Sequence, residues 1–361
     1  MLSVPSVDIS KLFGTARLES GVMRIDGGLP SVLARVPATA AALERQGYDG
    51  AWCGEVNHDP FLPLVLAAEH TSRLEIGTCI AVAFARNPMS VAQLGWDLQA
   101  YSQGRFVLGL GSQVRPHIEK RFGMPWGQPV SRMREFILAL RAIWASWQDG
   151  TPLRFEGEFF THTLMTPTFV PEPHPYGQPR IFVAAVGTAM TRMCGEVADG
   201  MHTHAFTTRR YLQEVTLPAL AEGLTRAGRG RGDVQVCYPA FVATGRTAAE
   251  VEVAADAMRQ RIAFYGSTPA YRGVLDLHGW GELQTELRAL SLRGEWAAMG
   301  KLIDDEVLDA FAVVGPLDTL ADRVRERFEG VVDRLMFSLP EGTPAETVTA
   351  VLEAVRGPRA G

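Results

Sequence analysis

The sequence predicts an α/β protein that folds as a (β/α)8 TIM barrel. Strand-like and helix-like segments alternate along the chain, which is typical of a parallel sheet with helical crossovers. The alternation completes eight units without a break in composition, which favours one closed barrel over two doubly wound domains. The segment 74–82 is almost continuously apolar, as expected for a strand that is buried on both faces.

The first half of the chain is expected to contain four strand–helix units. A strand at residues 22–26 leads into a helix at 32–46, and Gly47 is a suitable stop for that helix. Strands follow at 48–54, 74–82 and 105–110, and helices at 61–71 and 89–103. Apolar residues then recur at three-to-four spacing and form one helical stripe. The stripe consists of Met133, Phe136, Ile137, Leu140, Ile143, Trp144 and Trp147.

Two insertions are expected to interrupt the second half. The first, at about residues 150–179 after the fourth helix, is rich in Pro and Gly and contains a predicted hairpin around 155–159. The second, at about residues 265–312, lies between strands seven and eight, where the connection is too long for one crossover. The expected strands are 180–186, 200–205, 234–244 and 332–339, and the expected helices include 189–198 and 209–227.

The last two helices have clear sequence signals. Before strand eight, Leu317, Leu320, Val324 and Phe328 share one helix face. After strand eight, a capping box with Pro at the first helical position is predicted to begin the final helix. The capping box consists of Thr343, Pro344 and Glu346. We therefore expect a single barrel domain over residues 23–361, preceded at 1–22 by a leader or arm, or by an over-long start.

The composition argues against several classes of protein. A net charge of −5 is unfavourable for nucleic-acid binding, which needs a concentrated basic face. No apolar run has the length of a membrane helix, and the first 22 residues lack the apolar core of an export signal. The four cysteines, Cys53, Cys79, Cys194 and Cys237, form no C-x-x-C pair. Free thiols are typical of a reducing compartment, so we expect a cytoplasmic protein.

In a barrel of this kind, chemistry takes place where strands end and helices begin. After the second strand, Glu55 and His58 are candidates, because a His can donate or accept a proton near neutral pH. The structural alternative is that Asn57 and Asp59 cap the next helix and that His58 is a surface residue. The sequence leaves these two interpretations about even.

The third and fourth junctions could approach a ligand with their backbone. Cys79 has no basic neighbour in the local sequence, so an unreactive buried thiol is expected there. In the fourth junction, Gly109, Gly111 and Ser112 would allow close contact with a planar or phosphorylated ligand. A dinucleotide fingerprint is not complete, since Val114 stands where the third Gly belongs. The following basic run could meet an anionic cofactor tail or be a solvated helix start. It contains Arg115, His117, Lys120 and Arg121.

Two further junctions carry polar groups. Gly187 and Thr188 open a helix whose free N–H groups suit a phosphate, although any helix begins in this way. His202 and His204 share one face of a strand and suggest a metal site. Because companion carboxylates and a further His are not evident at the strand ends, we expect no metal.

Taken together, the junctions resemble those of the luciferase-like flavin and deazaflavin oxidoreductases. The resemblance extends from about residue 23 to 356 and depends on residues 50–61, 74–88, 104–112 and 196–200. Residues 117–126 and 264–271 are similar to one actinobacterial subfamily, which is usually assigned to coenzyme F420.

The resemblance implies roles for individual residues. It implies a non-prolyl cis peptide against the cofactor ring, matched here by Cys79–Ile80. Gly109, Gly111 and Ser112, followed by Gln113, match the loop beside the cofactor, and Gly187 and Thr188 match its phosphate loop. Glu55 is near the position of an acidic residue at the cofactor, with His58 in the same loop.

One departure bears on the substrate. The deazaflavin-dependent sugar-phosphate dehydrogenases of this superfamily carry Asp-His directly after strand two and a Glu after strand four. Here the first pair is Glu55-Val56 and the second loop contains Gln113-Val114. A sugar phosphate is therefore not the expected substrate.

The resemblance implies hydride transfer between F420 and a small organic molecule, with His58 as proton donor and Glu55 orienting it or the cofactor. Gln113, His202 and His204 are second choices for the donor. The main alternative is an FMN-dependent monooxygenase that uses O2 and a separate flavin reductase. A metal-dependent hydrolase and a non-catalytic cofactor-binding barrel are weaker alternatives. A homodimer is possible, because dimers are common among the relatives.

Overall fold

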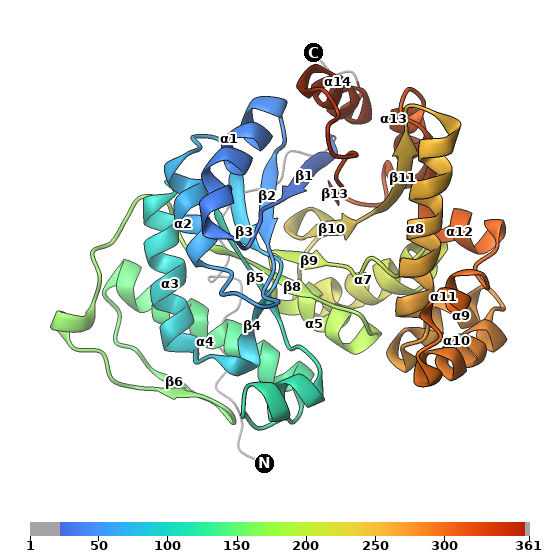
Figure 1. The fold of residues 1–361 in the computed structure, drawn as a ribbon. Helices are drawn as coiled ribbons and strands as arrows, with labels where there is room; N and C mark the ends of the chain where they lie inside the picture. Colours follow the sequence, from blue (N-terminus) through green and yellow to red (C-terminus); the bar gives the residue numbers. More distant parts are fainter. Residues whose placement is uncertain (1–21, 358–361) are drawn as a thin grey trace.

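The computed structural model describes residues 22–357, which form a closed barrel of parallel strands with helices around it (Figure 1). The barrel strands are β1 Arg24–Gly28, β2 Gly50–Cys53, β3 Glu75–Thr78, β4 Ala81–Val82, β5 Phe106–Gly111, β8 Arg180–Ala184, β9 Gly200–His202, β10 Gln235–Pro239 and β13 Arg334–Met336. They follow the order β3-β2-β1-β13-β10-β9-β8-β5-β4, and the pairing of β3 with β5 closes the ring. The predicted (β/α)8 TIM barrel is therefore confirmed.

Two short strands, β3 and β4, together fill one position of the barrel. The apolar segment predicted as one strand at 74–82 is interrupted after Thr78. Strand β3 pairs with β2 and β5, and β4 continues the pairing with β5. The interruption lies at the carboxyl end of β3, where the predicted site begins.

The crossover helices cover the outside of the barrel much as the apolar periodicity predicts. They are α1 Val36–Gln46, α2 Leu62–Glu69, α3 Pro88–Tyr101, α4 Pro129–Asp149, α5 Thr188–Val197, α7 Leu217–Arg226, α13 Leu320–Phe328 and α14 Ala345–Arg356. Gly47 ends α1 with a φ of 91°, a conformation that glycine adopts without strain. The whole predicted stripe of α4 is buried, so it faces the core as expected.

The predicted hairpin in the insertion after α4 is confirmed. Strand β6 Phe155–Glu156 pairs antiparallel with β7 Thr161–His162. The carboxylate of Glu135, on α4, accepts hydrogen bonds from three successive N–H groups of the turn, residues 158–160, at 2.9, 2.7 and 2.6 Å. These three hydrogen bonds help to anchor the hairpin to α4.

The prediction of a single seventh strand at 234–244 is wrong. Strand β10 ends at Pro239, and β11 Phe241–Gly245 leaves the barrel to pair in parallel with β12 Ala312–Pro316. The N–H of Ala240 still donates to the carbonyl of Met336 in β13 at 2.9 Å. Pro239 has no N–H group to offer on the opposite side of the strand, toward β9, and the chain changes partner after it.

The excursion between β11 and β12 has a hydrophobic core of its own. Its helices are α8 Ala248–Gly266, α9 Arg272–Leu277, α10 Gly281–Arg293, α11 Trp296–Gly300 and α12 Asp305–Phe311. They gather at one side of the barrel (Figure 1). Their buried cluster includes Phe241, Ile262, Leu287 and Phe311, and the barrel contributes Phe206 to it. The excursion thus spans residues 241–316 and is longer than the insertion predicted at 265–312.

The predicted capping box of the last helix is wrong. Helix α14 begins at Ala345 after Pro344, with no side-chain cap. The hydroxyl of Thr343 instead donates to the carbonyl of Pro340 at 2.7 Å, so it is not free for the helix. The leader predicted at 1–22 lies, apart from Val22, outside the described residues. Among the described helices, none combines the length and apolarity that crossing a bilayer requires.

Candidate functional site

The predicted site residues lie at the carboxyl ends of four barrel strands and in the loops that follow them. Glu55 and His58 follow β2, Cys79 and Ile80 join β3 to β4, Gly109 and Gly111 lie in β5 with Ser112 and Gln113 after it, and Gly187 and Thr188 follow β8. Because all barrel strands are parallel, their carboxyl ends meet at one end of the barrel. The structure therefore brings all of these residues to the same end.

The peptide bond between Cys79 and Ile80 is cis, as the family resemblance implies. The N–H of Cys79 donates to the carbonyl of Cys53 at 2.8 Å, and the N–H of Glu55 donates to the carbonyl of Ile80 at 3.1 Å. A Cβ atom on Gly111 would lie only 2.7 Å from Cδ1 of Ile80. Glycine at 111 therefore leaves the space that the Ile80 side chain occupies.

Burial makes Cys79 a poor nucleophile. It raises the pKa of the Cys79 thiol to about 12, and the negative charge of Asp26 acts in the same direction. Since the thiolate is the reactive form, this supports the interpretation of Cys79 as an unreactive thiol.

Gly109 has a packing role that the sequence did not reveal. Its N–H donates to Oγ1 of Thr78 at 2.9 Å, and that hydroxyl donates to the carbonyl of Gly109 at 2.6 Å. A Cβ atom at this position would lie 1.8 Å from the carbonyl oxygen of Thr78 and 3.1 Å from Nε2 of His202. The absence of a side chain thus lets strands β3 and β5 approach each other closely.

Ser112 and Gln113 turn the chain away from the end of β5. Gln113 has a φ of 60°, in the left-handed region that few non-glycine residues adopt. The hydroxyl of Ser112 donates to the carbonyl of Gln113 at 3.1 Å. Both residues are half-buried, so this turn forms part of the barrel mouth.

The start of helix α5 is an open N-terminus. Gly187 is its N-cap, no side chain caps it, and a Cβ atom on Gly187 would have no heavy atom within 4 Å. The first N–H groups of a helix have no partner within the helix and favour anions. Gly187 and Thr188 could therefore hold a phosphate group without a change of backbone.

Glu55 is bound to the neighbouring strand rather than to His58. Its carboxylate accepts the N–H of Val82 at 2.7 Å and pairs with Arg86 at 2.5 Å. The side chain of Glu55 is only 7% exposed. Among the described contacts, none joins Glu55 to His58, so the structure supports an anchoring role for Glu55 between the β2 loop and β4.

Replacing Glu55 with glutamine should therefore lower stability. The amide would keep the shape of the side chain but leave Arg86 without its most buried partner, at an expected cost of about 1–3 kcal/mol. Chemical denaturation in urea would measure the change. Asp59→Asn is the matched control, because Asp59 pairs with the same Arg86 at 3.0 Å but is 42% exposed, and we expect it to cost less than about 1 kcal/mol. Equal losses in both variants would contradict the anchoring role.

His58 is exposed in the loop after β2. In the same loop, Asp59 accepts the N–H of Phe61 at 2.8 Å. Phe61 precedes α2, and no side chain caps that helix, so the prediction that Asn57 and Asp59 cap it is wrong. Arg121 donates to the carbonyl of Val56. This bond ties the His58 loop to the predicted basic run, where Arg115 also pairs with Glu119 at 3.0 Å.

His202 and His204 do not lie on one strand, as predicted, because β9 ends at His202, and they do not share an environment. His202 lies inside the barrel, with its ring 4.9 Å from that of Trp52 and 5.5 Å from that of Phe182. Burial, with the charge of Arg334 acting in the same direction, lowers the pKa of His202 to about 3. His204 instead contacts tyrosines of the excursion. Within residues 22–357, no group of three or more His, Cys, Asp or Glu side chains is arranged to hold a metal ion.

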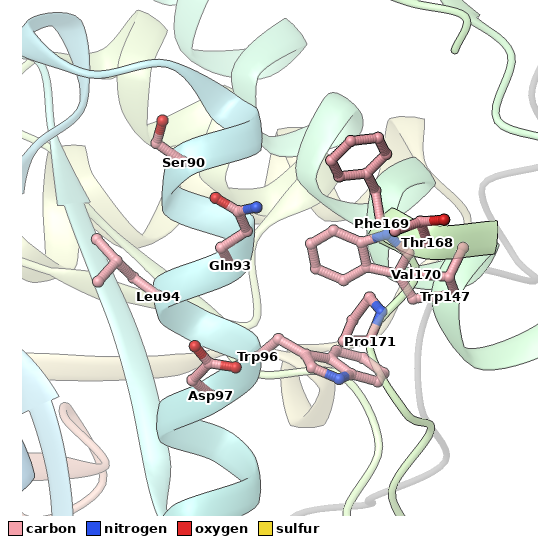
Figure 2. Close-up of a pocket in the computed structure, with 10 residues that line it drawn as sticks. All are labelled: Ser90, Gln93, Leu94, Trp96, Asp97, Trp147, Thr168, Phe169, Val170 and Pro171. Carbon is pink, nitrogen blue, oxygen red and sulfur yellow. The ribbon is translucent and has the colours of Figure 1, made fainter. Parts of the chain in front are cut away.

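A large groove lies away from these loops, on the outside of the barrel. It encloses about 660 Å³ between helix α3 and residues 168–171. Trp147, Phe169 and Pro171 lie together on one of its sides, opposite α3 (Figure 2). None of the predicted site residues lines it, so it is distinct from the barrel mouth.

Comparison with known proteins agrees with this arrangement. The profile of the luciferase-like monooxygenase family matches residues 15–334. An uncharacterized protein of Mycobacterium tuberculosis is 64% identical over 314 residues, which are 87% of this chain and 92% of that protein.

Two solved structures show the same fold. The coenzyme F420 dependent tetrahydromethanopterin reductase from Methanopyrus kandleri has a TM-score of 0.76 at 21% identity, over 93% of this chain and 99% of that one. The oxygenating constituent of 3,6-diketocamphane monooxygenase from Pseudomonas putida, in complex with FMN, has a TM-score of 0.65 at 16% identity. That alignment covers 93% of this chain and 98% of the monooxygenase.

Proposed function

The chain belongs to the luciferase-like monooxygenase family, and we propose that it transfers a hydride between coenzyme F420 and a small organic substrate. F420 is the coenzyme in the name of the Methanopyrus kandleri reductase. It carries a chain of carboxylates, which the basic run from Arg115 to Arg121 could meet. These two points favour F420 over a shorter flavin.

The open N-terminus of α5 is the observation that carries the binding of a phosphate-bearing flavin or deazaflavin. Gly187 and Thr188 would receive the cofactor phosphate, because a Cβ at Gly187 meets no atom and the first N–H groups have no cap. Ile80, Gly111 and Ser112 would lie along the ring system. When bound, the deazaflavin supplies a two-electron hydride carrier that reacts poorly with oxygen.

The protein's own part is to hold the two reactants, exclude water and provide one proton. We assign the proton to His58, which is exposed at the mouth of the barrel and whose residue type changes charge near neutral pH. Glu55 acts indirectly, because it fixes the start of the β2 loop to Val82 and Arg86.

His58→Ala should therefore lower turnover by about 100-fold or more, the usual contribution of a general acid, with little change in cofactor affinity. Steady-state kinetics and a fluorescence titration on the same variant would measure the two effects. His70→Ala is the matched control, since His70 is exposed at the end of α2 and, within residues 22–357, its ring bonds only to the carbonyl of Leu66. Unchanged turnover in the His58 variant would refute the assignment.

The second candidate function is an FMN-dependent monooxygenase that uses O2. The FMN-bound 3,6-diketocamphane monooxygenase has the same fold, and the open start of α5 would suit the phosphate of FMN equally well. This function needs a separate flavin reductase as partner. The homodimer and the cytoplasmic location stay predictions, and light scattering on the purified protein would test the former.

Titration of the purified protein with F420 and, separately, with FMN distinguishes the two functions. Micromolar binding of F420 without binding of FMN would support the hydride-transfer enzyme. The opposite result would favour the monooxygenase, to be assayed with a reductase and oxygen. Binding of neither would overturn both cofactor assignments.

A further inference from the structure

His204 is held in one tautomer at the mouth of the barrel. It lies two residues beyond the end of β9, and its Nδ1 accepts the backbone N–H of Phe206 at 3.0 Å. A backbone N–H can only donate, so Nδ1 carries no proton. The neutral ring must therefore carry its proton on Nε2 and can donate a hydrogen bond from that atom.

Two tyrosines of the excursion hold the imidazole in place. The ring of Tyr271 stacks on that of His204 at 4.4 Å and 22°, and Tyr265 meets it edge-on at 4.7 Å and 84°. Burial by these neighbours lowers the pKa of His204 to about 4. The ring is thus neutral at pH 7 and offers a donor without a charge.

The Nε2 atom of His204 is free and accessible. Among the described residues, no hydrogen bond uses this atom. Nε2 of His202 is buried and has no partner, whereas Nε2 of His204 is not among the buried atoms without a partner. A polar hydrogen at the mouth that is fixed by its surroundings and has no protein acceptor is placed to meet a ligand.

The surroundings of His204 favour a neutral ligand over an anion. Three arginines lie in the adjacent segments, and each one has a protein partner. Arg209 donates to the carbonyl of Glu326 at 2.7 Å, Arg210 pairs with Glu214 at 2.9 Å, and Arg272 pairs with Asp276 at 3.3 Å. Carboxylates therefore already compensate the charges of Arg210 and Arg272, and among these three arginines Arg209 alone would attract a phosphate or carboxylate.

We propose that His204 donates its Nε2–H to the acceptor atom of a neutral substrate, a carbonyl oxygen or an imine nitrogen. This inference rests on the proposed function, because it names the substrate class of that site. A neutral imidazole keeps its proton, so His204 orients and polarises the acceptor and the transferred proton comes from another group. Tyr271 and Tyr265 are positioning residues for this donor.

A pair of probes that differ only in the acceptor tests the hydrogen bond. Acetophenone has the carbonyl, and ethylbenzene has nearly the same shape without it. Calorimetric titration of the wild-type protein and of His204→Phe, with and without F420, would measure both affinities. We expect the variant to bind acetophenone about tenfold more weakly and ethylbenzene equally well, while His70→Phe changes neither.

Several results would overturn the proposal. They are equal binding of acetophenone by wild type and variant, an equal loss for both probes, and no binding of acetophenone by the wild type. Because these titrations measure no hydride transfer, they can fail while F420 binding succeeds, and they can succeed when F420 does not bind. The two proposals are therefore tested separately.

The tautomer on which the proposal depends can be tested without a ligand. Nitrogen-15 NMR of the His204 ring should show one protonated nitrogen, unchanged between about pH 5.5 and 8. In Tyr271→Leu the ring loses its stacked cover, so its titration should move up toward the ordinary histidine range. A wild-type ring that titrates near pH 6.5 would contradict the proposal.

Discussion

Gly109→Ala is expected to lower the stability of the barrel more than any other glycine-to-alanine substitution at the site. The new Cβ would lie 1.8 Å from the carbonyl oxygen of Thr78, far inside van der Waals contact, and this oxygen belongs to the backbone of a buried strand. Either β3 or β5 must move, which would also disturb the two hydrogen bonds that join Thr78 to Gly109. We expect a loss of about 4 kcal/mol or more, which is a large part of the total stability of a domain.

Urea denaturation followed by circular dichroism would measure this loss, and Gly187→Ala is its matched control. Gly187 has an extended backbone with φ of −97°, and a Cβ there would meet no atom within 4 Å. Because alanine is a poorer N-cap than glycine, its variant should lose about 1 kcal/mol. If the proposed phosphate site is correct, cofactor affinity would nevertheless fall, because the methyl group would occupy the cradle. A Gly109 variant as stable as the Gly187 variant would refute the packing role.

These two glycines show what the sequence could and could not reveal. Both stand at junctions where a strand ends, so both were predicted to approach a ligand with their backbone. The sequence cannot distinguish a glycine that leaves room for a ligand from one that leaves room for a neighbouring strand. The distinction depends on residue 78, which lies 31 positions away along the chain.

Local patterns predicted the barrel well because its elements alternate with a regular period. The two wrong predictions depended on single groups. The seventh strand ends at Pro239, which has no N–H group, and the hydroxyl of Thr343 bonds to the carbonyl of Pro340 and does not cap the last helix. The sequence also could not predict contacts between segments that lie far apart along the chain. The ion pair of Glu55 with Arg86 is the clearest of them, and it changed the role that we assign to Glu55.

The second large effect is expected at the opposite end of the barrel, in a buried ion network around Arg334. This side chain is fully buried. Its Nε and Nη2 donate to both carboxylate oxygens of Asp26 at 2.8 and 2.7 Å, and its Nη1 pairs with Glu75. Glu75 also pairs with Arg24 and Arg180, both at 2.7 Å.

Arg334→Met should cost about 3–5 kcal/mol, because it removes one partner of a buried pair and leaves the charge of Asp26 uncompensated. The remaining donor to that carboxylate would be the indole N–H of Trp52 at 2.8 Å. Urea denaturation at pH 7 would measure the loss. Arg24→Gln is the matched control, since Arg24 pairs with the same Glu75 but is 41% exposed, and it should cost less than about 1 kcal/mol. Similar losses of stability in the two variants would show that the loss does not depend on how deeply the arginine is buried.

The same network predicts how the loss depends on pH. Burial alone would raise the pKa of Glu75, but the charges of Arg334, Arg180 and Arg24 outweigh it and hold that pKa well below its usual range. A carboxyl whose pKa is lowered by folding stabilises the protein above its unfolded pKa, and this contribution disappears as the pH falls toward the folded value. Arg334→Met removes the arginine whose charge lowers the pKa of Glu75 most, so the stability of the variant should fall less steeply than that of wild type between about pH 5 and 3. The difference between the two proteins would therefore shrink on acidification, and a constant difference over that range would refute the coupling of Glu75 to Arg334.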